Sequence, residues 1–126
     1  MNEPGYRAMN PNGRVPTIDD AGFVLWESNA IVRYLAAKHG AGTLWPESLQ
    51  QRADSDRWMD WCTSTLAAPM TALFWQLVRT PAEKRDARAL EDARAQSEAL
   101  FRLLDERLAA RPFIAGAHLT MGDIPV

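Results

Sequence analysis

The chain has 126 residues, of which 47% are hydrophobic and 24% charged, and its formal net charge at pH 7 is −2. This is the composition of an ordinary globular protein, with no basic footprint for nucleic acid and no apolar run of 18 residues for a membrane span. The single cysteine, Cys62, excludes an internal disulfide and any paired-cysteine metal or redox motif. We therefore expect a cytoplasmic protein without nucleic-acid or membrane partners.

The first 40 residues carry turn, strand and helix signals in close succession. Asn10-Pro11-Asn12-Gly13 has the residue choice of a type I turn. A strand is predicted to follow from Arg14 to Asp19, and a returning strand from Phe23 to Trp26. Apolar side chains alternate onto both faces of the second strand, so we expect other parts of the protein to cover each face.

A helix is predicted to begin at Ser28, directly after the second strand, and to end near His39. In one interpretation Ser28 caps this helix, Glu27 favours its positive end, and no ligand is needed. In the other, the hydroxyl, the neighbouring carboxylate and the backbone N–H groups of the first turn form a small polar site. Such a site could bind a carboxylate and an ammonium together, and the residues alone leave both interpretations open.

The segment Gly40–Pro46 holds two glycines and a proline, which is typical of a short linker, and we expect its Leu44 and Trp45 to pack on a neighbouring surface. Every later signal is helical. We therefore place a domain boundary here and divide the chain into residues 1–43 and residues 44–126.

Three helix starts with capping signatures follow the linker. Ser48 opens a long helix that we expect to reach Arg79, with a kink near residues 66–68 caused by Pro69. Thr80 opens a second helix to about Ala110. A third capping box spans Thr120–Asp123 at the end of the chain.

Apolar side chains recur at helical spacing in this second part. One buried stripe is predicted on the second helix, formed by Leu90, Ala93, Ser97, Leu100, Phe101, Leu104 and Leu108. Four aromatic residues of the long helix could belong to the core, to a dimer interface or to a substrate pocket: Trp58, Trp61, Phe74 and Trp75. We expect most of these four to be core residues.

The order and spacing of these motifs resemble those of the cytosolic glutathione transferases. The stretch NPNGRVPTIDDAGFVLWESNAIVRYLA, residues 10–36, is similar to the second half of their thioredoxin-like domain. LWPES with RADSDRWMDW resembles their linker and first long helix, and FIAGAHLTMGDI the motif that opens their buried central helix. The resemblance implies an α+β fold: the C-terminal half of a thioredoxin-like domain followed by an incomplete all-α domain. We expect a fragment that lacks the first strand and helix and the C-terminal helices.

The resemblance also implies a glutathione-binding site made by Val15, Pro16, Glu27 and Ser28. The bond before Pro16 would be cis, and the Val15 backbone would pair with the cysteinyl part of glutathione as strands pair. Glu27 would bind the γ-glutamyl ammonium, and Ser28 with the helix N-terminus its carboxylate. Asn29 and Gly13 depart from the residues that several classes of the family carry there.

No catalytic residue can be named within this chain. The resemblance implies that the hydroxyl or thiol that favours the glutathione thiolate lies upstream of Met1. Cys62 and Tyr6 are possible substitutes, but we interpret Cys62 as a buried packing thiol and place Tyr6 in a surface segment. His39 and His118 are isolated, so we expect a helix end and a loop for them, and no metal.

The function implied is that of a homodimeric glutathione transferase, which conjugates reduced glutathione, as a co-substrate, to small hydrophobic electrophiles. Two alternatives share the fold: a glutathione-dependent disulfide or peroxide reductase, and a non-catalytic interaction module. The pairs Val15-Pro16 and Glu27-Ser28 favour an enzyme, because a module that binds no glutathione needs neither pair.

Overall fold

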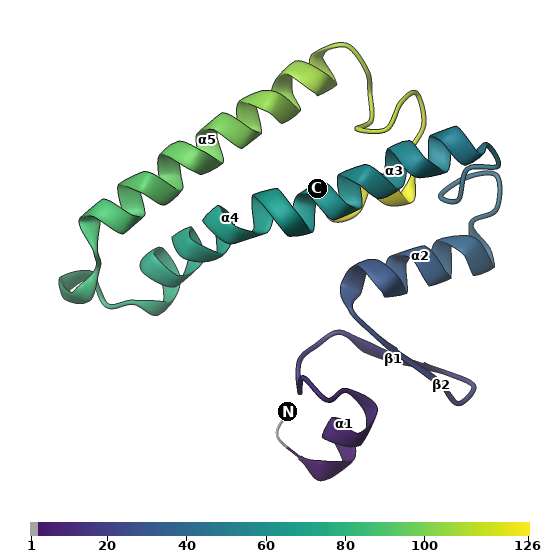
Figure 1. The fold of residues 1–126 in the computed structure, drawn as a ribbon, viewed down its shortest axis with the longest axis horizontal. Helices are drawn as coiled ribbons and strands as arrows, with labels where there is room; N and C mark the ends of the chain where they lie inside the picture. The colour runs from purple at the N-terminus through teal and green to yellow at the C-terminus, as the bar shows by residue number, and fades with distance from the viewer. Residues whose placement is uncertain (1–2) are drawn as a thin grey trace.

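A computed structural model of the chain describes residues 3–126, and its helices dominate the fold (Figure 1). The elements in chain order are α1 (Pro4–Met9), β1 (Thr17–Asp20), β2 (Phe23–Trp26), α2 (Ser28–His39), α3 (Leu49–Trp61), a π-helical turn (Cys62–Leu66), α4 (Ala67–Phe74), a second π-helical turn (Trp75–Arg79), a 3-10 turn (Ala82–Lys84), α5 (Ala87–Ala109) and a 3-10 turn (Met121–Asp123). Helix α5 runs back alongside α3 and α4, while α1, the hairpin and α2 lie beyond α3 (Figure 1). None of the described helices is both long and apolar enough to cross a membrane.

The two strands form an antiparallel hairpin in which Thr17 pairs with Trp26 and Asp20 with Phe23. Ala21 and Gly22 make the turn with positive φ angles of 52° and 90°, the backbone that two-residue hairpin turns require. The first strand begins three residues later than the sequence pattern predicts. Its predicted start is wrong because the Arg14 carbonyl accepts hydrogen bonds from side chains instead of a strand ladder.

The turn before the hairpin is confirmed. The Gly13 N–H donates to the Asn10 carbonyl at 2.9 Å, and the Asn12 N–H donates to the Asn10 Oδ1 at 3.0 Å. Asn10 is 3% exposed, so its side chain belongs to the interior of this region. An Asx turn therefore holds the chain where it enters the hairpin.

The long helix predicted from Ser48 to Arg79 is present with two changes of helical type. Ser48 precedes the first helical residue, but its side chain makes no capping hydrogen bond. The disturbance expected from Pro69 takes the form of the π-helical turn Cys62–Leu66, which lies a few residues earlier than residues 66–68. Because proline has no N–H and its ring crowds the preceding turn, a wider turn there relieves the conflict.

The predicted start of the next helix is wrong. Residues 82–84 form only one 3-10 turn, and α5 begins at Ala87. Its cap is Asp86, whose Oδ1 accepts hydrogen bonds from the N–H groups of Arg88 and Ala89, each at 3.0 Å. Two possible caps lie six residues apart, and the aspartate that accepts both bonds determines where the helix starts.

The core lies where α2, the linker and α5 meet α3. One cluster joins Ala36, Met59 and Met121, with Val32, Leu44 and Trp45 packed against it. A second joins Trp58, Leu104 and Ile114, with Trp61 and Ala115. The expected packing of the linker is thus confirmed, whereas the division at residues 43 and 44 stays a prediction.

The predicted stripe on α5 is confirmed in part. Ala93, Ser97 and Leu104 are buried, and Leu90 and Leu100 are half-buried. Phe101 and Leu108 are exposed, contrary to the prediction, although α5 packs on α4.

The hairpin is tied to α2 by Asp20, whose Oδ2 accepts a hydrogen bond from Tyr34 and pairs with Lys38. The hydrogen bond from Lys38, followed by that from Tyr34, lowers the pKa of Asp20 below its usual value. A carboxylate whose pKa is lower in the folded protein stabilises it above about pH 4, and this contribution is lost as the pH falls through the folded-state pKa.

We therefore expect Asp20→Asn to flatten the fall in stability between pH 5 and pH 3. Urea unfolding at both pH values measures the free energy of unfolding, and the difference between them should be smaller in the variant than in the natural protein. Asp105→Asn, on the exposed side of α5, is the matched control and should leave the difference unchanged. An unchanged difference in Asp20→Asn would contradict the assignment.

Candidate functional site

The four residues singled out by the sequence lie at one end of the hairpin. Thr17 and Trp26 form the last pair of the ladder, so Val15-Pro16 precedes it on one strand and Glu27-Ser28 follows it on the other. All four residues are exposed, and Val15 keeps 66% of its surface. The peptide bond between Val15 and Pro16 is cis, as the resemblance implies. The hairpin register thus brings together two pairs of residues whose corresponding members are twelve positions apart in the sequence.

The chain turns abruptly from β2 into α2 at Glu27, whose φ of 74° lies in the left-handed region. A positive φ is uncommon for a residue other than glycine, and such backbones cluster at functional sites. The Glu27 carbonyl accepts the first helical hydrogen bond, from the Ile31 N–H at 2.9 Å. Glu27 therefore holds the N-cap position predicted for Ser28, and Ser28 is the first residue of the helix.

The side chains of Glu27 and Ser28 therefore both lie at the N-terminal end of α2. The prediction that Ser28 caps the helix is wrong, and Glu27 at the N-cap makes no side-chain capping hydrogen bond. The N–H groups of a helix's first turn have no partner within the helix, and they carry its positive dipole end. A carboxylate side chain, a hydroxyl and these N–H groups thus occur together on an exposed surface.

Tyr6 and Asn10 contact the residues that flank Val15-Pro16, a role that the sequence analysis did not predict. The hydroxyl of Tyr6 donates to the Arg14 carbonyl at 2.7 Å and lies 2.9 Å from the Thr17 Oγ1. The side-chain amide of Asn10 donates to the same two acceptors, at 2.7 and 3.1 Å. Tyr6 therefore contacts the chain on both sides of Val15-Pro16, through the Arg14 carbonyl and the Thr17 side chain. No local pattern signals the role of Tyr6, because its contacts join α1 to residues eight and eleven positions away.

Helix α2 is joined to α3 by polar contacts along one side. Arg33 pairs with Asp56 and Asp60, each at 2.6 Å. One turn closer to the site, the side-chain amide of Asn29 donates to the Met59 carbonyl at 2.9 Å and to the Thr63 Oγ1 at 3.0 Å. The residue that departs from the family pattern thus contacts the long helix.

A cavity of about 420 Å³ lies beside this contact. It is lined by Ser28, Asn29, Val32, Cys62, Thr63, Ala67, Ile124 and Pro125. The Cys62 thiol, which is half-buried, donates to the Pro125 carbonyl with a sulfur–oxygen distance of 2.9 Å, and burial raises its pKa. A thiol with a raised pKa is a poor nucleophile at neutral pH, so Cys62 does not resemble a catalytic cysteine.

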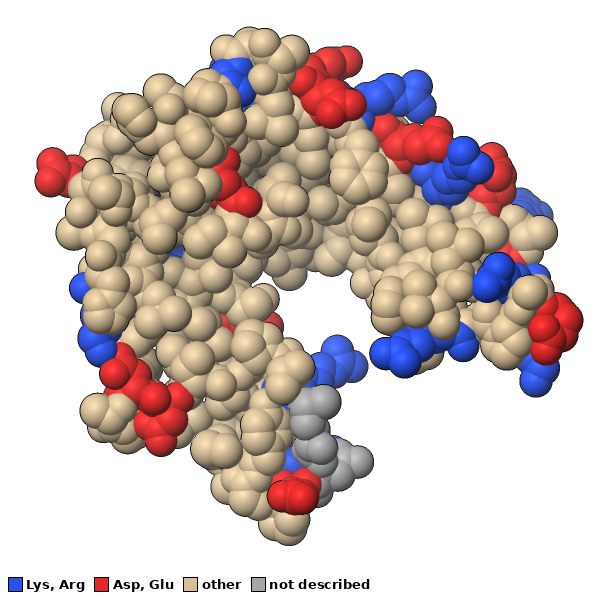
Figure 2. Space-filling view, turned by 180° about the vertical axis from the view of Figure 1, so that it is seen from behind, with Lys and Arg blue, Asp and Glu red and all other residues tan. Residues whose placement is uncertain are grey.

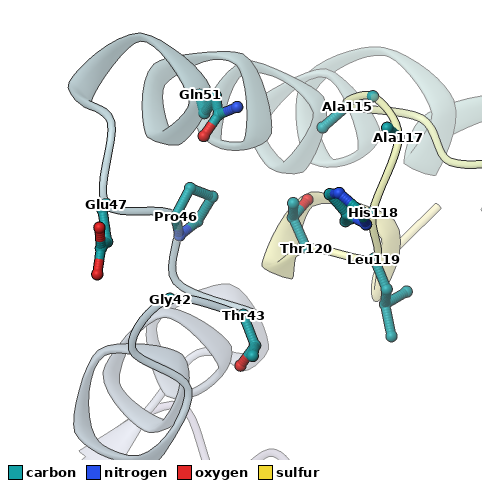
Figure 3. Close-up of a pocket in the computed structure, with 11 residues that line it drawn as sticks. Gly42, Thr43, Pro46, Glu47, Gln51, Ala115, Ala117, His118, Leu119 and Thr120 are labelled. Carbon is teal, nitrogen blue, oxygen red and sulfur yellow. The ribbon is translucent and has the colours of Figure 1, made fainter.

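A larger cavity, of about 670 Å³, lies on another part of the surface (Figure 3). Pro46 and Glu47 come from the linker, Gln51 from α3, and Ala117 and His118 from the loop after α5. His118 lies in this exposed loop and His39 in the last turn of α2, as predicted. Within residues 3–126, no group of three or more His, Cys, Asp or Glu side chains could hold a metal ion.

The aromatic residues of the long helix divide between core and surface. Trp58 is 7% exposed and contacts Trp61 edge-on, with ring centroids 5.4 Å apart. Phe74 and Trp75 remain 44% and 58% exposed. Figure 2 also shows an open hollow on one face of the molecule. The hollow lies between the end where the described chain starts and the opposite end, and basic side chains lie at both of its rims. Trp58 is a core residue and Trp61 is half-buried against it, whereas Phe74 and Trp75 lie at the surface, so the expectation that most of the four are core residues is wrong.

Comparison with known proteins agrees with this fold. Residues 1–38 match the family model described as the N-terminal domain of glutathione S-transferase. The chain is 45% identical over 123 residues to glutathione S-transferase GstB of Escherichia coli K12, covering 96% of this chain and 59% of that protein. It is 33% identical to glutathione S-transferase D7 of Drosophila melanogaster, covering 98% of this chain and 54% of that one.

A solved structure gives a similar result. The theta-class glutathione S-transferase of the citrus canker pathogen Xanthomonas axonopodis pv. citri, crystallised with glutathione bound, superposes with a TM-score of 0.92 at 51% identity. The superposition covers 98% of this chain and 59% of that one, so the chain spans about three fifths of the length of these relatives. Over nearly its whole length the chain is thus similar in sequence and in fold to glutathione S-transferases.

Proposed function

We propose that the protein is a glutathione transferase that conjugates reduced glutathione to small hydrophobic electrophiles. One observation carries the proposal: Val15-Pro16 and Glu27-Ser28 lie exposed at the same end of the hairpin, on either side of its last pair. Glutathione bound to the Xanthomonas relative supports the choice of ligand.

The Val15 backbone would bind the cysteinyl part of the tripeptide. An extended peptide can join an exposed strand through main-chain hydrogen bonds, a common mode of peptide recognition. Val15 lies just outside the ladder, and Thr17 is the first residue that pairs with β2. Main-chain bonds from Val15 would leave the cysteine side chain of glutathione free to point away from the strand, because side chains stand out of the plane of pairing.

The start of α2 would bind the γ-glutamyl end. Its ammonium would pair with the Glu27 carboxylate, and its carboxylate would accept hydrogen bonds from the Ser28 hydroxyl and from N–H groups of the first helical turn. Anions bind well at helix N-termini because the N–H groups and the helix dipole both favour negative charge. One end of the hairpin would therefore hold both charged groups of the same ligand.

The reaction would be attack of the glutathione thiolate on the electrophile. Tyr6 and Cys62 are not proposed to activate the thiol, because the Tyr6 hydroxyl is bound to Arg14 and Thr17 and the pKa of Cys62 is raised. The activating hydroxyl or thiol stays a prediction for a position upstream of Met1.

We further propose a cytoplasmic homodimer. Exposed apolar side chains on α4, the following π-helical turn and α5 support a surface that pairs with a second copy: Phe74, Trp75, Val78 and Phe101. Trp75 and Val78 keep 58% and 65% of their surface. Large exposed apolar side chains are common at protein interfaces.

The test is a calorimetric titration of the natural full-length protein with glutathione and with an S-alkyl glutathione. We expect micromolar to millimolar binding, and a rise in Kd of about tenfold or more in Ser28→Ala, because a hydrogen bond to a charged group is lost. Ser64→Ala, on the exposed side of the π-helical turn, is the matched control. Absence of binding to both ligands would overturn the proposal and direct the search to protein partners.

A further inference from the structure

The proposed site depends on the exact position of the first turn of α2. The Glu27 backbone has a left-handed φ, Ser28 begins the helix, and neither side chain is buried. An exposed helix end tends to fray unless other contacts hold it. The contacts that fix this turn therefore determine how well it is arranged for a ligand.

Asn29 makes the contacts nearest to the site. Its side-chain amide donates to the Met59 carbonyl at 2.9 Å and to the Thr63 Oγ1 at 3.0 Å. Thr63 in turn donates to the same Met59 carbonyl at 3.2 Å. Three residues from two helices thus form one small hydrogen-bonded group, and Asn29 is the member that belongs to α2.

The change of helical type in the long helix accounts for the position of this group. The π-helical turn begins at Cys62, whose N–H is shared between the carbonyls of Trp58 and Met59. Met59 is completely buried, so its carbonyl is held in place by the core around it. A carbonyl with two lone pairs at this junction accepts side-chain donors, and Asn29 supplies one. The amide is therefore attached to a rigid part of the molecule.

The other polar contacts between the two helices are farther from the site. Arg33 lies one turn along α2, and the side chain of Asp60, one of its partners, is 72% exposed. Exposed ion pairs contribute little to stability. Arg33 thus joins α2 to α3 without fixing the turn that holds Ser28.

We infer that Asn29 is a positioning residue for the γ-glutamyl end of glutathione, acting through its hydrogen bonds to Met59 and Thr63. This inference rests on the proposed function. Asn29 need not contact the ligand: it holds the Ser28 hydroxyl and the first-turn N–H groups against α3, so the site forms before glutathione arrives. A preorganised site binds more tightly because less freedom is lost on binding.

The experiment measures Kd for glutathione and for γ-glutamylcysteine in the natural full-length protein and in three variants. Asn29→Ala is expected to raise both values by about five- to tenfold. The rise should be equal for the two ligands, because both carry the γ-glutamyl group. Thr63→Val, which removes one acceptor of the amide, should raise them by about two- to threefold. Asp60→Asn, which removes only an exposed ion pair between the same helices, should leave them unchanged.

The outcomes separate this inference from the proposed function. If the natural protein binds no glutathione, the proposed function fails and the inference falls with it. If the natural protein binds and Asn29→Ala binds equally well, only the inference is overturned. An equal loss in Asp60→Asn would also overturn it, since the effect would then be a general loosening of the helix contact. A loss for glutathione without one for γ-glutamylcysteine would place the effect at the glycine end and overturn it too.

Discussion

Replacing Asp123 with alanine is expected to lower the free energy of unfolding by about 3 to 5 kcal/mol, because one carboxylate holds two separate segments. Its Oδ1 accepts the Ile114 N–H at 2.7 Å, and its Oδ2 accepts the N–H and hydroxyl of Thr120 at 2.8 and 3.0 Å. Hydrogen bonds to charged groups contribute more than neutral ones, and removal leaves the donors without a partner. Ile114 belongs to the core, so its packing is affected as well.

Urea unfolding of the natural full-length protein and of the variant, at one protein concentration, measures the effect of Asp123→Ala. Asp92→Ala, on the exposed side of α5, is the matched control and should change the free energy of unfolding by less than about 0.5 kcal/mol. A loss in Asp123→Ala no larger than in the control would show that the capping box contributes little.

Gly122→Ala is the second substitution with a large expected effect, a loss of about 3 kcal/mol in the free energy of unfolding. A methyl group at this position would lie 2.8 Å from the Ser55 carbonyl oxygen and 2.9 Å from the Ser55 Cα. Both are backbone atoms of α3, and Ser55 is completely buried, so they cannot move aside without displacing the helix. The final turn would then separate from α3.

Thermal unfolding followed by circular dichroism would detect this loss as a lower Tm for Gly122→Ala. Gly5→Ala is the matched control, because an added methyl group there meets nothing within 4 Å. It should leave Tm unchanged or raise it slightly, as alanine favours helices over glycine. Equal Tm values for the two variants would show that the Ser55 backbone can shift at little cost to make room for the methyl group.

Local sequence patterns predicted the elements that are formed by contacts between residues close in the sequence. The Asn10 turn, the hairpin at Ala21-Gly22 and the capping box at Thr120 all rest on residues within four positions of one another, and all three are confirmed. The start of α5 shows the limit of such patterns. Thr80 and Asp86 are both acceptable caps, and only the folded chain shows that Asp86 accepts the bonds.

Distant contacts could not be predicted in the same way. Nothing near Tyr6 in the sequence indicates that its hydroxyl meets Arg14 and Thr17, and nothing near Asn29 points to Met59, thirty residues away. The positive φ of Glu27 was missed because glutamate shows no preference for it. The identity of the proposed site residues came from a family resemblance, and their common position at one end of the hairpin from the register of the strands.

The anchoring of the Arg14 carbonyl by Tyr6 and Asn10 has a consequence for the rate and selectivity of ligand capture. A strand that is already fixed can accept a peptide at first encounter, without waiting for a loop to order. Recognition through the main chain does not depend on which side chain the peptide carries at that point. Discrimination between peptides would then depend on the two charged groups at the γ-glutamyl end. Cysteine-containing peptides whose first residue is joined through its α-carboxylate, and not through a γ-carboxylate, would be rejected there.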